Sequence, residues 1–284
     1  MLRQLSVKSC NRAWLGLVPF LVFEFAFEII PLLGLVKSAF LSGNGLSLAN
    51  FERVMQPAVL ASFGNSIGLS LGTALAGTIA GAVIAYIIVT SRNARVREAL
   101  TALADVTANF GGAPLAFAFV IILGSTGVIT LMLKKIGIDL YPGFRIYSLA
   151  GLALAYLYFQ IPLAILLLIP SFQGLRKEWA EAASSLGAGK TQYWLLIALP
   201  VLRPALVSCF FLLFANAFGA YATAWTLTGS SVNLVTVQIA ALIRGEVQLE
   251  PAFADAIAVM SLLVMAICVF VHQWLVRSAR TYTR

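Results

Sequence analysis

One segment in the second half of the chain has residue types that could bind a phosphate. Residues 181–200 (EAASSLGAGKTQYWLLIALP) include SSLGAGKT, whose Gly189, Lys190 and Thr191 fit the end of a phosphate-binding loop. Such a loop needs the spacing G-x-x-x-x-G-K-[ST] after a buried strand, so that backbone N–H groups and the lysine reach the phosphates. Here Ser184 occupies the first glycine position, and the upstream RKEWAEAASSL consists of helix formers. The segment therefore predicts a helical loop that binds no nucleotide.

Carboxylates inside apolar runs are a second group that could do chemistry. Glu24 and Glu28 are four residues apart and share one face of an expected helix. Two such carboxylates repel unless one is protonated or a cation or basic partner is near. They predict a cation path or a subunit contact, or else a hydrogen bond within the helix bundle. Asp105 lies eight residues from Arg97, which suits a gate or a helix contact as well as a solute contact.

Uncharged polar residues in apolar segments are candidates for a solute pathway, because such groups are costly to expose to lipid. Asn109 precedes FGGAP, where a helix must loosen, and a broken helix inside a membrane is tolerated where it lines a cavity. We therefore name Asn109 first as a pathway residue, followed by Asn216, Tyr221 and Gln160. Hydrogen bonding between helices is the alternative role for each of them.

The remaining reactive residue types do not form a catalytic or metal-binding pattern. The three cysteines are far apart, and the single His272 closes an apolar run, so neither type has a metal-ligand spacing. The sequence has no Ser-His-Asp grouping and no carboxylate pair suited to a soluble cleft. We expect no enzyme activity, no cofactor and no metal.

Composition predicts that these residues lie on membrane helices. The 284 residues are 61% hydrophobic and 11% charged, with a mean hydropathy of +0.94, which leaves too little polar surface for a soluble globule. A helical span needs about 20 apolar residues. The segments that meet this length are residues 13–41, 60–89, 100–123, 148–170, 201–221 and 252–276, with GGAP at 111–114 breaking the third. We predict an all-α polytopic membrane protein with six transmembrane helices in a single domain, residues 1–284.

The basic residues predict how the chain crosses the membrane, because lysine and arginine collect in cytoplasmic loops. One set of loops holds thirteen of them: Arg3, Lys8, Arg12, Arg92, Arg95, Arg97, Arg176, Lys177, Lys190, Arg203, Arg277, Arg280 and Arg284. The opposite loops hold five: Arg53, Lys134, Lys135, Arg145 and Arg244. We expect both termini and the loop at 171–200 in the cytoplasm, and Gly43, Lys134 and Gly245 in the periplasm. This membrane role accounts for the net charge of +8 without a nucleic-acid partner.

The loop at 171–200 also has a geometry of its own. EWAEAASSL predicts a short helix whose alanines allow another protein to approach closely, and Gly187 and Gly189 allow a sharp turn after it. TQYWLLIALP predicts a second helix that starts near Thr191 and runs until Pro200. The two helices would project into the cytoplasm as an L-shaped pair. An ordinary solvated hairpin is the alternative.

The same loop matches a known signature at all of its marked positions: E-A-A, three residues, G, nine residues, I, one residue, L-P. The matching residues are Glu181, Ala182, Ala183, Gly187, Ile197, Leu199 and Pro200. The signature is that of ABC importer permeases of type I, which the whole chain resembles. FLLFANAFGAYATAWTLTG at 211–229 is similar to the branch for polyamines, ferric iron, phosphonates and sulfate-like oxyanions, although the acidic residue before F-G-A is absent.

This resemblance implies a permease subunit of a binding-protein-dependent importer in the bacterial inner membrane, working by alternating access on a small polar solute. It implies cytoplasmic ATP-binding subunits, a second permease as a copy or paralogue, and a periplasmic substrate-binding protein as partners, besides the lipid bilayer. The signature residues would form the coupling helix that docks on the ATPase. The absence of a central lysine or arginine favours a cationic or neutral solute.

The alternative from another class is an ion-coupled secondary transporter in which Glu24, Glu28 or Asp105 carries a proton. Such a transporter predicts inverted repeats. We see no convincing duplication between residues 1–140 and 141–284.

Overall fold

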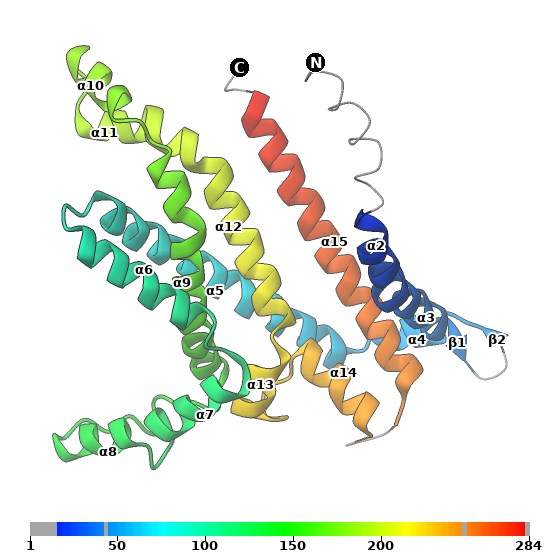
Figure 1. Cartoon of the computed structure of the whole chain (residues 1–284). Coiled ribbons are helices and arrows are strands. Elements are labelled where there is room, and N and C mark those ends of the chain that lie inside the picture. The colour runs from blue at the N-terminus through cyan, green and yellow to red at the C-terminus, as the bar shows by residue number, and fades with distance from the viewer. Residues whose placement is uncertain (1–15, 43–44, 246–248, 282–284) are drawn as a thin grey trace, which may run out of the picture. The chain divides into compact units, whose positions relative to one another are not determined.

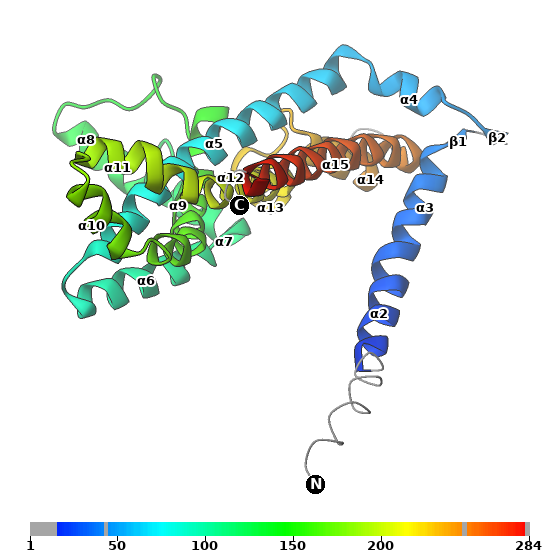
Figure 2. The same cartoon turned by 90° about the horizontal axis from the view of Figure 1, so that it is seen from above.

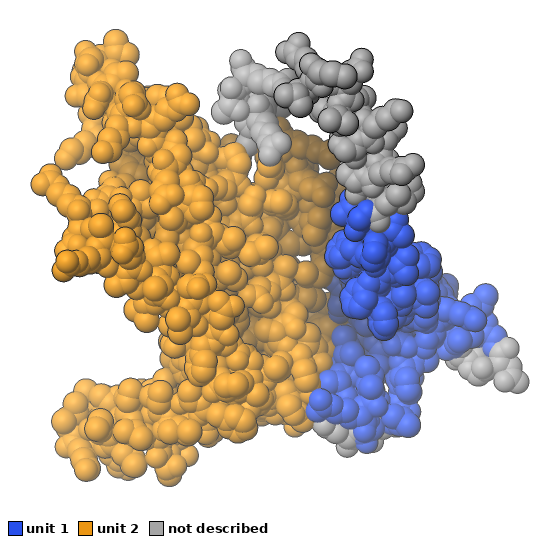
Figure 3. Space-filling model, in the orientation of Figure 1, with its two compact units in different colours: residues 1–56, 239–262 blue, residues 57–238, 263–284 orange. Residues whose placement is uncertain are grey.

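A computed structural model describes residues 16–42, 45–245 and 249–281, and these are helical almost throughout (Figure 1). The chain divides into two compact units, each made of two stretches of sequence (Figure 3). One unit comprises residues 1–56 and 239–262, and the other comprises 57–238 and 263–284. Gly43 and both chain ends lie outside the described residues.

The first unit begins with a helical segment whose middle turn is wider than an α-helix. Helix α2 (Val18–Glu24) continues through the π-helical turn η2 (Phe25–Ile29) into α3 (Ile30–Ala39). The Ile30 N–H bonds to the Phe25 carbonyl, and Pro31, which has no N–H to donate, comes next. The π turn therefore lets the helix pass the proline without ending.

The candidate carboxylates Glu24 and Glu28 lie on this first segment. Glu24 ends α2 and is half-buried, whereas Glu28 lies in η2 and is exposed. None of the residues of α2 or η2 is buried. The described part of the first unit thus leaves this apolar segment uncovered.

A short hairpin and helix follow in the first unit. Strand β1 (Leu41–Ser42) pairs antiparallel with β2 (Gly45–Leu46), with Leu41 opposite Leu46, and α4 (Ala49–Val54) comes next. The buried Asn50 side chain donates to the carbonyls of Ala39 and Leu41, at 3.2 and 3.0 Å, which holds α4 against the end of α3. Arg53 forms a salt bridge with Glu250 and lies over the Phe253 ring, 4.1 Å from its centre.

The second unit is built around α5 (Pro57–Thr90), which packs against α9 (Leu149–Gln173) and α12 (Leu199–Gly219). Glycine is required where α5 meets α9, because a Cβ on Gly81 would lie 2.4 Å from that of Ala164. Helix α6 (Ala94–Ala108) also packs on α9 (Figure 2), and the Asn93 side chain caps its start by accepting from the Arg95 N–H at 3.0 Å. Small residues thus set the close helix packing of this unit.

The core of the second unit lies where α9 meets α7 (Gly112–Leu123) and α13 (Tyr221–Thr228). Leu115, Leu152 and Tyr156 are almost completely buried there, and the Tyr156 hydroxyl donates to the Ala220 carbonyl at 2.8 Å. Helix α8 (Val128–Lys135) follows α7 after the turn between Gly124 and Gly127. The aromatic hydroxyl thus joins α9 to the start of α13.

Two further helices, α14 (Val235–Arg244) and α15 (Pro251–Thr281), each have residues in both units. In the second unit, polar side chains of α5 fasten the loop that leads into α14. The Asn65 side chain donates to the Asn233 carbonyl at 3.0 Å, and the Ser66 hydroxyl accepts from the Val235 N–H at 3.0 Å. The intramembrane Asn65 therefore has a packing role.

Six segments of the described residues are long and apolar enough to cross a membrane, as predicted. They are Val18–Ala39, Pro57–Thr90, Gly112–Lys135, Leu149–Gln173, Lys190–Gly219 and Pro251–Arg277. The third lies further along the chain than the predicted 100–123, because α6 is polar, with Arg95, Arg97 and Glu98 in its first turns. The break before Gly112 nevertheless falls beside the GGAP sequence.

Candidate functional site

The signature loop begins with α10 (Lys177–Ser185), which ends in a tight hydrogen-bonded turn. The Ala188 N–H bonds to the Ala183 carbonyl and the Gly187 N–H to the Ser184 carbonyl, both at 2.9 Å. These two bonds make a Schellman motif, whose central residue must take a left-handed conformation. Gly187 takes it with φ of +80°, so the signature glycine is set by backbone geometry.

The second helix of the loop is longer than predicted and does not end at Pro200. Helix α11 (Lys190–Tyr193) continues through the π turn η3 (Trp194–Ala198) into α12. The Leu199 N–H bonds to the Trp194 carbonyl, five residues back, immediately before Pro200. A wider turn accommodates this proline as it does Pro31, so the helix runs on to Gly219. The predicted stop at Pro200 was wrong for this reason.

A side chain of α11 itself, that of Gln192, caps the start of this helix. The Gly189 N–H donates to the Gln192 side-chain oxygen at 2.8 Å, and Thr191 lies in the first helical turn. Figure 1 shows α10 and α11 at the end of α9 and α12 that is opposite α7 and α13. The loop thus stands at one end of the second unit.

Most of the signature residues are accessible on this loop. Of the seven marked residues, Ala183 is buried and Ile197 is half-buried, whereas Glu181, Ala182, Gly187, Leu199 and Pro200 are exposed. Leu186, which the sequence interpretation missed, is 88% exposed at the turn, and Leu196 is 74% exposed. A leucine directly before the glycine of the expected turn is the sequence signal that could have identified Leu186. Leu186, an exposed apolar side chain at a protruding turn, suits insertion into a protein cleft.

The resemblance of SSLGAGKT to a phosphate-binding loop has no structural counterpart. Helix α10 precedes the segment where a nucleotide-binding loop needs a strand, and Lys190 is the exposed first residue of α11. We predict that Lys190→Ala leaves ATP hydrolysis by an assembled transporter within about twofold of the parent, whereas a phosphate-contacting lysine is essential for hydrolysis. Measurement of ATP turnover checks this. ATP binding by the purified chain alone, lost on this substitution, would contradict it.

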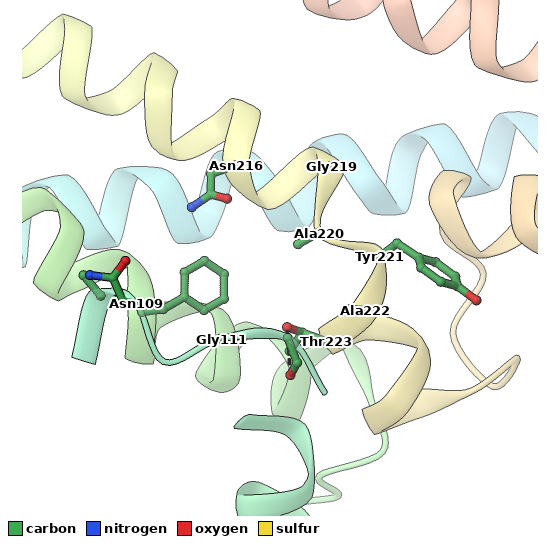
Figure 4. A pocket seen from close by; sticks show the side chains of 11 residues that line it. Asn109, Gly111, Asn216, Gly219, Ala220, Tyr221, Ala222 and Thr223 are labelled. Carbon is green, nitrogen blue, oxygen red and sulfur yellow. Dashed lines mark hydrogen bonds between the residues drawn. The ribbon is translucent and has the colours of Figure 1, made fainter. Parts of the chain in front are cut away.

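A cavity of about 570 Å³ in the second unit brings together three of the four predicted pathway residues. Asn109, Asn216 and Tyr221 all line it, and Phe159 and Thr223 line it too. Figure 4 shows the Asn109 and Asn216 amides on either side of this space, with the Tyr221 ring directed away from them. The side chains that line the cavity are amides, hydroxyls and apolar groups, and none of them carries a charge.

Two helix breaks form the wall of this cavity. Helix α6 gives way to α7 between Asn109 and Gly111, and α12 gives way to α13 at Ala220. Gly112 has φ of +69°, and its carbonyl accepts from the Thr223 hydroxyl at 3.4 Å. The two breaks thus contact each other beside a polar space, which is where broken helices are tolerated inside a membrane.

Gln160 lies outside this cavity. It is fully buried, and its side-chain nitrogen donates to the Thr73 hydroxyl at 3.3 Å and the Leu213 carbonyl at 3.4 Å. These bonds join α9 to α5 and α12, which is the alternative role that the sequence left open. Asp105 lies one turn before Asn109, whose side chain donates to the Asp105 carbonyl at 2.8 Å.

Phe159 and Thr223 are the cavity residues that the sequence interpretation missed. Thr223 follows Tyr221 by two residues, so the AYAT run after the glycine could have indicated it. Phe159 has no polar group and offers no comparable signal. Among the described residues, no group of three or more His, Cys, Asp or Glu side chains could hold a metal ion.

Comparison with known proteins decides the family. The model of the family "Binding-protein-dependent transport system inner membrane component" matches residues 77–281, which include the signature loop and every cavity residue. The chain belongs to this family. The predicted membership in the permease family of binding-protein-dependent transport systems is therefore confirmed.

Individual relatives agree with this family assignment. The chain is 25% identical over 274 residues to the ferric transport system permease protein FbpB of Actinobacillus pleuropneumoniae, covering 94% of this chain and 38% of that protein. It is 29% identical over 136 residues to the thiamine transport system permease protein ThiP of Brucella suis, covering 48% of this chain and 24% of that protein. The chain thus spans well under half the length of these relatives.

A solved structure supports the fold. The chain superposes with a TM-score of 0.74 on a chain from a crystal structure of a bacterial ABC transporter involved in the import of the acidic polysaccharide alginate. The match covers 98% of this chain and 99% of that chain at 18% identity. The all-α fold predicted from the sequence is therefore that of an ABC importer permease.

Proposed function

We propose that the chain is the transmembrane permease subunit of an ATP-driven, binding-protein-dependent importer for a small polar solute, with residues 1–284 acting as one transmembrane domain. The observation that carries the proposal is the signature loop. Its seven marked residues lie on a protruding helix pair, and Gly187 takes the positive φ of the turn between them without strain. The alternating-access cycle would then need a separate ATPase, because SSLGAGKT lacks the first glycine of a phosphate-binding loop and follows a helix where such a loop needs a strand.

The coupling step belongs to the signature loop. Its accessible apolar residues Leu186 and Leu196 would enter a cleft of a cytoplasmic ATP-binding subunit, and Glu181 on α10 would make a charge-assisted contact there. Because α11, η3 and α12 form one continuous helix, a push on the loop would move α12 along its length. The end of α12 bears Asn216 and the break at Ala220. Movement of the loop on ATP binding would thereby be transmitted through α12 to the cavity.

The cavity would form one wall of the solute pathway, and a second permease, a copy or a paralogue, would form the other. Asn109, Asn216 and Gly219 are exposed in the single chain, so the cavity opens away from the unit that forms it. Its uncharged lining suits a solute that is neutral, or one whose charge is recognised by the periplasmic substrate-binding protein. Tyr221 and Thr223 complete the polar edge.

The proposed topology predicts which residues a thiol reagent reaches. In a chain whose three cysteines are replaced by alanine, cysteine at Lys134 or Gly245 should react with a membrane-impermeant reagent in intact cells. Cysteine at Gly187 should react only after the cells are permeabilised, because the coupling loop would lie in the cytoplasm. Labelling at 187 in intact cells, with protection at 134 and 245, would invert the topology and remove the coupling step with it.

Reconstituted transport tests the function itself. The chain is purified together with the ATPase and the second permease encoded by adjacent genes, and the complex is placed in vesicles. The binding protein encoded by the same group of genes and candidate solutes are then added. We expect uptake that requires both ATP and the binding protein. Uptake by this chain alone, driven by a proton gradient and lost in Glu24→Gln or Glu28→Gln, would instead establish the secondary transporter.

A further inference from the structure

A basic cavity of about 480 Å³ lies in the second unit, where α5 and α9 end beside the signature loop. Its basic lining residues are Arg92, Arg97, Arg176 and Lys177. They come from the turn after α5, from α6, and from the start of α10. Within the described ranges none of the four is in a salt bridge, and no acidic residue lines the cavity. Four positive charges therefore line one space that has no carboxylate among its lining residues.

Aromatic side chains form the floor of this basic cavity. The Tyr86 ring contacts the Trp194 ring edge-on at 5.0 Å between centres and the Phe172 ring at 5.9 Å. Tyrosine and tryptophan favour the depth at which membrane and water meet, since each combines an apolar ring with a polar group. The basic cavity thus has the composition of a site at the surface of a bilayer.

A separate apolar groove of about 520 Å³ lies along an earlier stretch of α5. Leu75, Ile79 and Val83 of α5 line the groove, and Tyr86 and Val89 of α5 line the basic cavity. Their spacing of three and four residues places all five on one face of the helix. The other wall of the groove comes from α12 and from Leu275 of α15, also in the second unit. From Leu75 to Val83 the groove runs about 12 Å at the helical rise.

We propose that these two cavities, lined by one face of α5, bind an anionic phospholipid, with its phosphate among the four basic side chains and an acyl chain in the groove. The proposal rests on the membrane placement given above for the permease. A phosphate needs the positive cavity, and an acyl chain needs an apolar groove on the same helix face; a lipid alone satisfies both. Ala180 of α10 lines the basic cavity, so a bound lipid would stabilise the position of α10 in the signature loop.

Lipid titration of the delipidated transporter complex, followed by native mass spectrometry, tests the proposal. We expect phosphatidylglycerol to bind more tightly than phosphatidylcholine. The double variant Arg92→Gln with Arg176→Gln should weaken phosphatidylglycerol binding roughly 25-fold, since each basic side chain near an anionic headgroup contributes roughly fivefold. Ala82→Trp, which fills the groove at a lining residue, should weaken it roughly tenfold by displacing about two methylene groups.

Matched controls separate this site from general charge effects. Arg95→Gln removes an exposed charge from the same helix as Arg97 but from outside the cavity, and it should leave lipid binding unchanged. Arg92→Lys keeps the charge and should restore most of the binding. Glycerol 3-phosphate should not compete at concentrations that saturate the lipid site, because it has no acyl chain for the groove.

Several outcomes would overturn the proposal, each in a different way. Equal binding of phosphatidylglycerol by the parent and the double variant would show that the basic cavity is not the lipid site. Full competition by glycerol 3-phosphate would make it a site for a free phosphate. Loss of the ATPase from the double variant with lipid binding intact would make it a protein contact. None of these depends on transport, so the function proposed above would be unaffected.

Discussion

Replacing Gly187 with valine is expected to abolish ATP-driven uptake while the chain still inserts into the membrane. Gly187 has φ of +80°, which a β-branched residue adopts only with strain. Crowding is not the cause, because a Cβ at this position would meet no atom within 4 Å. The strain would open the two hydrogen bonds that join Gly187 and Ala188 to α10 and so displace the loop. Uptake in vesicles, with membrane yield measured beside it, checks the prediction.

A graded series at the same turn makes this prediction specific. Asparagine tolerates positive φ and should retain most of the uptake, whereas alanine should lose part of it, since the left-handed conformation costs roughly 1–2 kcal/mol for a residue with a Cβ. Gly189→Ala is the matched control, because Gly189 has φ of −72° and room for a methyl group. Normal uptake by Gly187→Val, or an equal defect in Gly189→Ala, would contradict the role given to this turn.

The signature loop was predictable from the sequence because its constraints are local. A helix of alanine and glutamate followed by glycine determines the helix end, and the Schellman bonds at Gly187 span only six residues. The fate of Pro200 was not predictable in the same way. Proline usually ends a helix, and the π turn that lets α12 continue is stabilised by packing of Ala198 inside the bundle.

The cavity was predictable only in part, because it depends on contacts between distant segments. Asn109 was indicated by the GGAP sequence beside it, and Asn216 and Tyr221 by polarity in an apolar run. The sequence could not separate them from Gln160, which is equally polar. Only the approach of α5 and α12 shows that Gln160 is sealed between helices by bonds to Thr73 and Leu213.

The basic cavity was not predicted from the sequence, because it too depends on contacts between distant segments. Its arginines were read as topology signals, since basic residues at the ends of spans are common there. Arg92 and Arg176 are 84 positions apart in the sequence, and the packing of α5 on α9 brings them to one cavity. A charge count therefore predicts the side of the membrane but does not predict the pocket.

Replacing Ala222 with tryptophan is expected to stop uptake by filling the proposed pathway. Ala222 is exposed, lines the 570 Å³ cavity on α13, and faces the other helix break, where a Cβ on Gly112 would lie 3.8 Å from its own. An indole there would occupy the space between Asn109 and Asn216 that a solute needs. We expect uptake to fall by about tenfold or more, because one large aromatic group blocks a narrow passage without any change in the coupling loop.

Ala102→Trp is the matched control for this change. Ala102 is an exposed residue of α6, the helix that bears Asn109, but it does not line the cavity. The control should transport at close to the parent rate, and both variants should keep ATP hydrolysis and bind the ATPase normally, since α10 and α11 are untouched. Normal uptake by Ala222→Trp would place the solute pathway elsewhere. Loss of ATPase binding in that variant would show that the tryptophan acts by deforming the fold, because a blocked passage leaves the coupling surface intact.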